Sequence, residues 1–207
     1  DGNRTRKTPT AAAEVAIHLT GLYPDWWTGR RFDEPTSWIV AGPTNELTRD
    51  VCQFALVGGM MEGTKTPDGT GWIPKDKIGD VNFRQCGVQN VIDTVKVRHK
   101  SGGWSDLAFK SYEQGNVKFQ GVSRHGVWLD EEPSDNMIFT EAQTRTIDKS
   151  GLIMFTRTPL FGMSEVVRHF LDGGEGIYYS TATWEESPHL NKAERDRLLK
   201  SYPEHER

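Results

Sequence analysis

Helix-like spacing, with an apolar residue at every third or fourth position, recurs along the chain. In residues 9–22 this spacing runs from Ala12 to Leu22 and predicts a helix that ends near Gly21. Three further helices are predicted at residues 48–57, 164–171 and 191–201. Between the first and the second of these helices the pattern changes to one typical of strands.

Strand-like segments separate the predicted helices. Short apolar runs, typical of buried strands in a parallel sheet, occur at residues 37–41, 127–129 and 152–156. Other strands are predicted at residues 91–99, which alternate as an exposed or edge strand does, at 107–110 and at 177–184. Residues 58–80 have no periodicity and are predicted to form a long surface loop. Strands that alternate with helices predict an α/β fold, with a mainly parallel sheet flanked by helices in a single domain.

The composition is that of an ordinary globular protein. The chain has 207 residues and a formal net charge of −4, enough length for one large domain or two small ones. It lacks the basic excess of a duplex-binding module, so any contact with DNA must be local or shared between subunits. Cys52 and Cys86 lack the spacing of a zinc site and are too few for a disulfide framework, which favours a reducing compartment. We see neither a signal peptide nor an apolar run of membrane-spanning length.

Adjacent carboxylates follow the apolar run at residues 127–129. Asp130 and Glu131 would lie at the carboxyl edge of a parallel sheet, where ligands bind in open α/β folds. One carboxylate there can hold Mg²⁺ while the next orients or deprotonates a water that attacks a γ-phosphate. The alternative is a solvated acidic turn after a strand.

The first eight residues partly match a phosphate-binding loop. Such a loop has the pattern G-x-x-x-x-G-K-[S/T], in which backbone amides wrap the phosphates and the hydroxyl reaches Mg²⁺. Lys7 and Thr8 occupy the last two positions, directly before a predicted helix, but Asp1 and Arg6 replace the glycines. Because glycine allows close backbone approach to a ligand, these replacements oppose efficient nucleotide binding. The alternative is an ordinary helix start.

Several blocks of the chain together resemble the large terminase subunits of tailed phages. They are GNR-x-x-KT (2–8), AAAEVAIHLTGLYPDWWTGRRFD (11–33), WIVAGPTNELTRDV (38–51), FKSYEQG-x-x-x-FQG (109–121), VWLDEEP (127–133), FTEAQTRT (139–146) and TPL-x-GMSEVVRHFL (158–171). The resemblance covers nearly the whole chain. It implies an ATPase of the P-loop NTPase class with an additional catalytic glutamate.

The resemblance also implies roles for particular residues. In the nucleotide site Lys7 would bind the β- and γ-phosphates, and Thr8 and Asp130 would coordinate Mg²⁺. The catalytic residues would be Glu131 and the loop arginine Arg4. The remaining nucleotide-binding positions would be Gly2, Asn3, Arg4, Thr5 and Arg6 in the loop, and Thr156 and Thr158 in a strand-end Thr-x-Thr-Pro motif that senses the γ-phosphate. Arg157 departs from the family, in which this position is usually apolar.

The same resemblance implies an assembly. Residues 1–203 would form the motor domain, truncated at its N-terminus, and residues 204–207 would begin a linker to an absent nuclease domain. The cofactors would be ATP and Mg²⁺. A ring of such subunits on the prohead, acting with the portal protein and the terminase small subunit, would drive double-stranded DNA inward without sequence specificity. It would act in the cytoplasm of the infected bacterium, with no membrane partner. A degenerate remnant that folds without binding ATP, and another P-loop motor such as a helicase, are the alternatives.

Other conspicuous residues have structural interpretations. Trp26 and Trp27 are predicted to pack in a loop corner, His18 to lie in or beside the core, and His125 to be structural. The pair Arg30–Arg31 is predicted to be a solvated face that could touch DNA phosphates.

Overall fold

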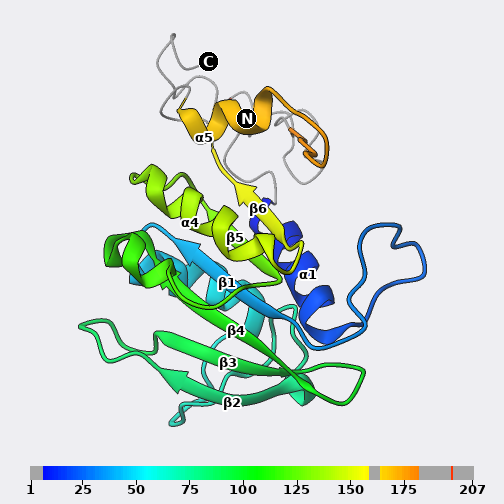
Figure 1. Ribbon diagram of the computed structural model, residues 1–207. Coiled ribbons are helices and arrows are strands. Elements are labelled where there is room, and N and C mark those ends of the chain that lie inside the picture. The colour runs from blue at the N-terminus through cyan, green and yellow to red at the C-terminus, as the bar shows by residue number, and fades with distance from the viewer. Residues whose placement is uncertain (1–6, 159–163, 182–196, 198–207) are drawn as a thin grey trace. The chain divides into compact units, whose positions relative to one another are not determined.

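A computed structural model describes residues 7–158, 164–181 and 197 of the chain. Residues Thr8–Arg157 form one compact unit built on a six-stranded sheet (Figure 1). Lys7 and the described residues from Thr158 onward belong to a second compact unit, which we treat separately. The nucleotide chemistry predicted for Gly2 to Arg6 falls outside the described residues.

The sheet is mixed and mostly parallel. Its strands are β1 (Ser37–Gly42), β2 (Ile78–Phe83), β3 (Ile92–Arg98), β4 (Trp104–Ser111), β5 (Gly126–Asp130) and β6 (Leu152–Thr156), and they lie in the order β2-β3-β4-β1-β5-β6. β1 pairs in parallel with β4 and β5, and β5 pairs in parallel with β6. β3 is antiparallel to both of its neighbours. The predicted parallel α/β sheet is therefore confirmed, and the antiparallel part of it was not predicted.

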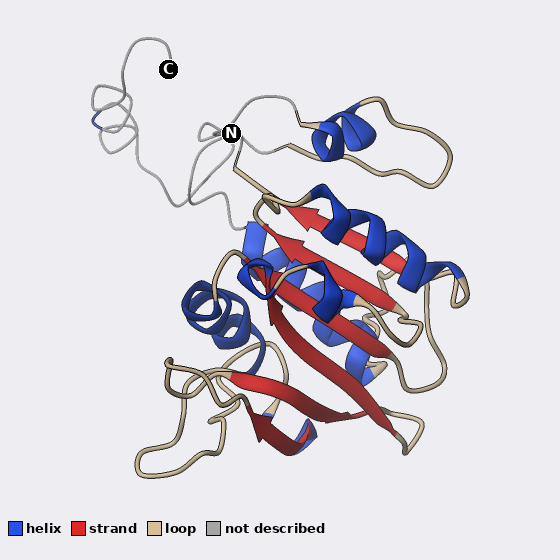
Figure 2. Ribbon diagram, turned by 60° about the vertical axis from the view of Figure 1, so that its left-hand side comes forward, coloured by secondary structure: helices blue, strands red, loops and turns tan. Residues whose placement is uncertain are grey.

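Helices cover both faces of the sheet (Figures 1 and 2). Those of the larger unit are α1 (Lys7–Thr20), α4 (Asn136–Ile147) and one continuous helical segment made of α2 (Asn45–Leu47), the π-helical turn η1 (Thr48–Gln53) and α3 (Phe54–Val57). Short 3₁₀ turns complete this unit: η2 (Lys75–Lys77), η3 (Tyr112–Gln114) and η4 (Asn116–Phe119). A further helix, α5 (Glu165–Leu171), belongs to the second unit.

The core on one face forms between α1 and the strands. Ala12, Val15 and Leu19 of α1 are fully buried and belong to one cluster with Trp38 and Trp128. Residues of α1 at this spacing lie on one side of the helix, so burying them seats α1 on the sheet. Since burial of a large apolar side chain stabilises a fold by about 1.5–3 kcal/mol, this interface holds α1 against β1 and β5.

The opposite face is covered by α4, against which the 3₁₀ turn η4 packs. Side chains of a strand alternate between faces, so Val127 and Leu129 lie across the sheet from Trp128. Both are fully buried, as is Ile138 of α4, which contacts β5 and β6. β5 therefore carries apolar residues on both faces, as the run before Asp130 predicted.

Four predictions about the elements need correction. The first helix ends at Thr20, because Gly21 takes a φ of 70°, and Leu22 is 48% exposed rather than part of the buried stripe. β3 is not an edge strand, because β2 pairs along its outer side. β2 begins inside the segment predicted as loop at residues 58–80. Residues 177–181 form no strand.

Several other predictions hold. The strand predicted at residues 152–156 has those bounds, but its prediction as a buried strand was wrong, because β6 is last in the strand order and all five of its residues are only partly buried. The helix predicted at residues 164–171 is α5, with Ser164 as its N-cap. α4 was not predicted from periodicity, because its buried stripe includes the polar Thr146 while the apolar Met137 and Ile147 are exposed. The helix predicted at residues 191–201 lies outside the described residues except for Arg197, which is helical.

Candidate functional site

The predicted site residues of the larger unit meet where β5 and β6 end. The two strands are parallel and in register, so that Asp130, the last residue of β5, lies opposite Thr156, the last residue of β6. Both side chains therefore stand at the carboxyl edge of the sheet. This is the edge at which open α/β sheets bind their ligands.

Asp130 is the centre of a buried hydrogen-bond group. Asp130 is 7% exposed. Its Oδ1 accepts a hydrogen bond from the hydroxyl of Thr156 at 2.6 Å and another from the hydroxyl of Thr8 at 3.3 Å. The indole Nε1–H of Trp128 donates to Oγ1 of Thr156 at 2.8 Å, which leaves the Thr156 proton for Asp130. Three elements, α1, β5 and β6, thus converge on one carboxylate.

The surroundings of Asp130 change its ionisation. Burial raises the pKa of Asp130 above its ordinary value, and the hydrogen bond from Thr156 opposes this rise. The buried thiol of Cys52, on the π-helical turn η1, lies close enough to this carboxylate to lower the pKa of Asp130. Burial, followed by the charge of Asp130, raises the pKa of Cys52 well above its usual range, so the thiol stays protonated as a donor. A hard cation beside Asp130 would offset the cost of burying its charge.

Glu131 follows in a strained backbone conformation. Its φ is 62°, in the left-handed region, which costs a non-glycine residue roughly 1–2 kcal/mol. Its N–H donates to the carbonyl of Thr156 at 2.7 Å, and its own carbonyl accepts the hydroxyl of Tyr112 at 2.8 Å. Both backbone polar groups of Glu131 are thus held by the ends of other strands. We call residues 130–132 the carboxylate turn.

Tyr112 reaches this turn from the end of β4. It is 7% exposed, and its hydroxyl also lies 3.0 Å from the carbonyl of Asp130 and 3.3 Å from that of Ala41. Burial, with a contribution from Asp130, raises the pKa of Tyr112 well above its ordinary value, so its hydroxyl keeps its proton. The phenol therefore keeps its single proton to donate, and the carbonyl of Glu131 is its nearest acceptor.

Arg157, which the sequence left unexplained, has an acidic partner. Its Nη1 lies 3.5 Å from Oε2 of Glu132, and both side chains are mostly buried. The ion pair joins the residue after β6 to the last residue of the carboxylate turn. An apolar residue at position 157 could not make this contact.

In the second unit, Lys7 and Thr158 form a hydrogen bond. The Lys7 Nζ donates to Oγ1 of Thr158 at 2.9 Å. The two residues are 151 positions apart in the chain, and both were predicted to bind nucleotide. Along the chain, Lys7 directly precedes Thr8 and Thr158 follows Arg157.

Sequence reasoning missed three members of the group around the carboxylate turn. They are Cys52, Tyr112 and Trp128. Tyr112 lies inside the block at residues 109–121 and Trp128 inside the block at residues 127–133, and both blocks carried part of the terminase resemblance. Cys52 occupies an ordinary apolar position of a helix, so nothing in its spacing marks it.

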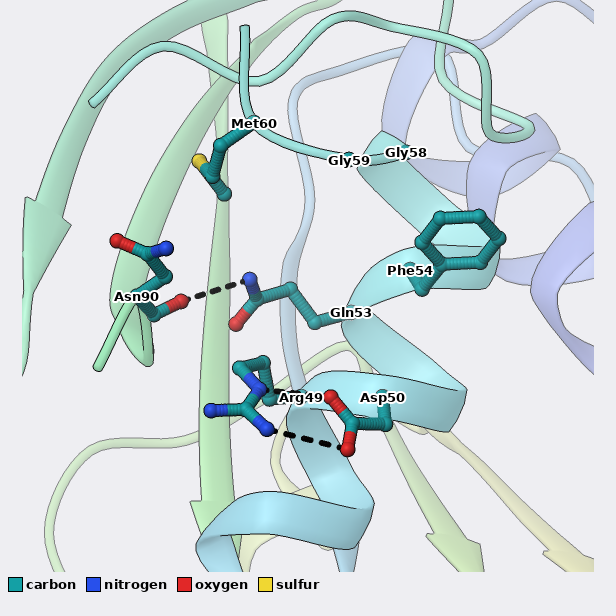
Figure 3. A pocket seen from close by; sticks show the side chains of 8 residues that line it. All are labelled: Arg49, Asp50, Gln53, Phe54, Gly58, Gly59, Met60 and Asn90. Carbon is teal, nitrogen blue, oxygen red and sulfur yellow. Dashed lines mark hydrogen bonds and ion pairs between the residues drawn. The ribbon is translucent and has the colours of Figure 1, made fainter. Parts of the chain in front are cut away.

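A cavity of about 490 Å³ lies elsewhere, beside the helical segment 45–57 (Figure 3). Its lining consists of Arg49, Asp50, Gln53, Phe54, Gly58, Gly59, Met60 and Asn90. The polar side chains pair within the protein: Arg49 with Asp50 at 2.7 Å, and Gln53 with the carbonyl of Asn90 at 3.0 Å. This lining includes none of the predicted site residues that the structure describes.

Asp130 and Thr8 offer oxygen atoms, the donor type that Mg²⁺ prefers. Within the described ranges no three His, Cys, Asp or Glu side chains gather as a metal cage. Mg²⁺ typically binds through one or two carboxylates together with phosphate oxygens and water. Asp130 and the hydroxyl of Thr8 are such a set.

The residues predicted to be structural lie at the other end of the strands. His18 is fully buried and stacks on Trp38, with ring centroids 5.3 Å apart. Trp27 packs edge-on against His18, but Trp26 is 72% exposed, so only one of the two tryptophans fills the corner. The backbone N–H of Ser37 donates to Nδ1 of His125 at 3.0 Å, a structural role.

Fold and site together define an α/β domain whose acidic residues stand at the carboxyl edge of parallel strands beside the helix α1. The chain belongs to the family of the terminase large subunit, T4likevirus-type, N-terminal, whose model matches residues 2–207. It is 36% identical over 225 residues to the terminase large subunit of Salmonella phage P22, an alignment that covers 100% of this chain and 44% of that protein. The chain thus spans less than half the length of this relative.

Solved structures of large terminases share the fold. The large terminase of a thermophilic bacteriophage, in one crystal form, has a TM-score of 0.66 at 14% identity, covering 98% of this chain and 44% of that one. The same bacteriophage protein in complex with ADP has a TM-score of 0.63 at 14% identity, over 98% and 44% of the two chains. The ATPase domain of the Thermus phage P74-26 large terminase has a TM-score of 0.55 at 15% identity, over 84% and 63%. Among the described helices, none is long and apolar enough to cross a membrane.

Proposed function

We propose that this chain is the ATP-hydrolysing motor domain of a viral terminase large subunit, which drives double-stranded DNA into the prohead. The observation that carries the proposal is the convergence of Thr8, Asp130 and Thr156 at one sheet edge. Membership of the terminase family, and the ADP complex of the large terminase from the thermophilic bacteriophage, support a nucleotide as the ligand.

Each residue has a part in binding Mg·ATP. Thr8 and Asp130 would hold Mg²⁺, which supplies positive charge against the phosphate oxygens when bound. Lys7, the first residue of α1, would meet the β- and γ-phosphates, and its present partner Thr158 would then be exchanged for a phosphate oxygen. Arg4 and the loop residues Gly2, Asn3, Thr5 and Arg6 would complete the phosphate site.

Glu131 would carry the chemistry. Its carboxylate would orient the attacking water and take its proton as the water adds to the γ-phosphorus and the bond to the β–γ bridging oxygen breaks. Thr156 links this event to the sheet, because its hydroxyl bonds Asp130 and its carbonyl accepts the N–H of Glu131. A change at the phosphate would therefore reach β6 through Thr156.

The assembly around this domain is part of the proposal. The partners are double-stranded DNA contacted through its backbone, the portal protein, the terminase small subunit and further copies of this chain in a ring on the prohead. The place of action is the cytoplasm of the infected bacterium. The low net charge of −4 fits a motor that shares its DNA contacts among subunits better than a module that binds DNA alone.

The alternative, a remnant that neither binds nor hydrolyses ATP, rests on Asp1 and Arg6 in the glycine positions. The buried contacts of Asp130 oppose it. A carboxylate that no longer held a metal would be costly to keep buried, and an apolar residue would serve the fold better there.

Calorimetric titration with Mg·ATP tests binding. The unaltered chain is compared with a double variant, Asp1→Gly with Arg6→Gly, and with Asp130→Ala as the control for the metal site. Binding by the unaltered chain supports the motor. Binding by the double variant alone would mean that the family and the site are assigned correctly but that this chain does not bind nucleotide. No binding by either folded protein would overturn the site.

Hydrolysis by the same proteins tests the chemistry. Glu131→Gln removes the base while keeping the shape of the side chain, so we expect a loss in kcat of about 10²–10⁴-fold with Mg·ATP binding retained. The matched control is Glu132→Gln, which neutralises the neighbouring carboxylate. An equal loss in both variants would contradict the assignment of Glu131.

A further inference from the structure

The conformation of Glu131 is set from outside the carboxylate turn. The residue has a φ of 62°, which a non-glycine residue seldom adopts unless its surroundings enforce it. Its N–H is bound by the carbonyl of Thr156 at 2.7 Å and its carbonyl by the hydroxyl of Tyr112 at 2.8 Å. The two hydrogen bonds come from opposite sides of β5, one from β6 and one from the end of β4.

Tyr112 is itself firmly placed. Ser111, the residue before it, pairs with Gly42 at the end of β1, and the Ser111 N–H donates to Oε1 of Gln114 at 3.0 Å in a capping box. The ring of Tyr112 is buried, and of the three carbonyls near its hydroxyl that of Glu131 is the nearest. The hydrogen bond from the Tyr112 hydroxyl therefore ties the carboxylate turn to the ends of β1 and β4.

We propose that Tyr112 is a positioning residue for the catalytic carboxylate. Its hydrogen bond to the Glu131 carbonyl holds Glu131 in the left-handed backbone conformation that points its side chain at the attacking water. The φ and ψ angles fix the direction in which the Cα–Cβ bond leaves the chain. A relaxed turn would carry the carboxylate away from the attacking water, and a misplacement of about 1 Å can cost about 10²-fold in rate. This inference rests on the proposed function.

The test compares two Tyr→Phe variants. Tyr112→Phe keeps the buried ring and removes only the hydroxyl. Tyr23→Phe is the matched control, because the hydroxyl of the partly buried Tyr23 also makes polar contacts, accepting the Phe32 N–H at 2.7 Å and lying 3.1 Å from Nδ1 of His18. We expect Tyr112→Phe to lower kcat for Mg·ATP by about tenfold or more, with KM within about twofold, and Tyr23→Phe to change neither.

Amide hydrogen exchange gives a readout that needs no activity. The Glu131 N–H should exchange about tenfold faster in Tyr112→Phe than in the unaltered chain, while the amide of Leu129 inside β5 is unchanged. Tyr23→Phe should leave both amides as they are. If Tyr112→Phe does not fold, Gln114→Ala takes its place, because it loosens the capping box and leaves Tyr112 intact.

The outcomes separate the two proposals. Faster exchange at Glu131 together with lower kcat supports the inference, whereas unchanged exchange, or faster exchange with unchanged kcat, overturns it. An unaltered chain that binds Mg·ATP but never hydrolyses it would overturn the proposed chemistry, and with it the catalytic purpose of Tyr112. The exchange rates would then still decide whether the hydroxyl holds the turn.

Discussion

The parallel strands carry a cluster of side chains at each end, and the two clusters are built differently. At the amino ends lies an aromatic cluster, formed by His18, Tyr23, Trp27, Phe32, Trp38 and His125. Its members meet mainly through ring contacts, such as Phe32 edge-on to His18 at 5.3 Å and to His125 at 5.5 Å. At the carboxyl ends the carboxylate turn is held by hydrogen bonds from Thr8, Tyr112 and Thr156.

The comparison separates conspicuous residues from functional ones. Tryptophans and histidines draw attention in a sequence, yet here they fill space: Trp38 lies so close to Gly126 that an added Cβ would meet its ring at 2.3 Å. The carboxylate turn holds a buried carboxylate, Asp130, and a strained residue, Glu131, which packing alone would not favour. We infer that the aromatic cluster stabilises the fold and that this stability offsets the cost of the strained and buried groups in the carboxylate turn.

The largest effect should come from the aromatic cluster. Trp38→Ala removes a fully buried indole that stacks on His18, and we expect the free energy of unfolding to fall by about 3–5 kcal/mol. Urea denaturation followed by tyrosine and tryptophan fluorescence measures it. Mg·ATP affinity of the folded fraction should not change. A loss below about 1 kcal/mol would mean that the cluster is not the stabilising end.

A smaller effect should expose strain in the carboxylate turn. Because glycine adopts positive φ without a steric penalty, Glu131→Gly should be more stable than Glu131→Ala by about 1 kcal/mol. Glu132, which does not have a positive φ, is the control, and there alanine should be the more stable replacement. Thermal or chemical denaturation of the four variants gives the comparison. Equal stability of the two Glu131 variants would show that the turn is relaxed.

The aromatic cluster should also respond to pH. Burial, followed by the charges of Lys149 and Arg30, lowers the pKa of His125, so in the folded state the neutral ring is favoured. An unfolded histidine takes up its proton near pH 6.5, so the free energy of unfolding should fall as the pH drops below that value. His125→Asn, which keeps an acceptor for the Ser37 N–H, should lessen the fall. The pKa of His99 is also lowered, mainly by burial. The free energy of unfolding of His125→Asn should therefore still fall somewhat as the pH drops.

The smallest effect concerns Arg157. The pair with Glu132 is long, at 3.5 Å, so a double-mutant cycle of Arg157→Leu and Glu132→Gln should give a coupling of about 0.5–1 kcal/mol. The cycle is measured by chemical denaturation at low and high salt, and the coupling should shrink as salt screens it. If no coupling is found at low salt, the pair of Arg157 and Glu132 does not help to hold β6 and the carboxylate turn together.

Much of the fold follows from local pattern. The apolar runs before Asp130 and up to Thr156 predicted two parallel strands, and β5 is buried at every position, as a strand covered on both faces should be. β6 carries a similar apolar run but lies at the end of the strand order, so it is only partly buried. β2 and the antiparallel pairing of β3 were missed, because alternation at period two says nothing about which neighbour a strand takes. Residues 177–181 alternate too, yet they are mostly exposed and pair with no strand among the described residues.

The order of residues along the chain was enough to indicate the family and the residue types that could do the chemistry: a lysine and a threonine at the start of a helix, and two acids at the end of a strand. Which of these groups meet depends on how the strands and helices pack. Tyr112, Cys52 and Trp128 join the site through contacts between elements far apart in the chain, and the left-handed turn at Glu131 depends on two of its neighbouring strand ends. Local sequence encodes the preference of each segment for helix or strand. Hydrogen bonds across the edge of a sheet form only when the strands lie side by side in their final order.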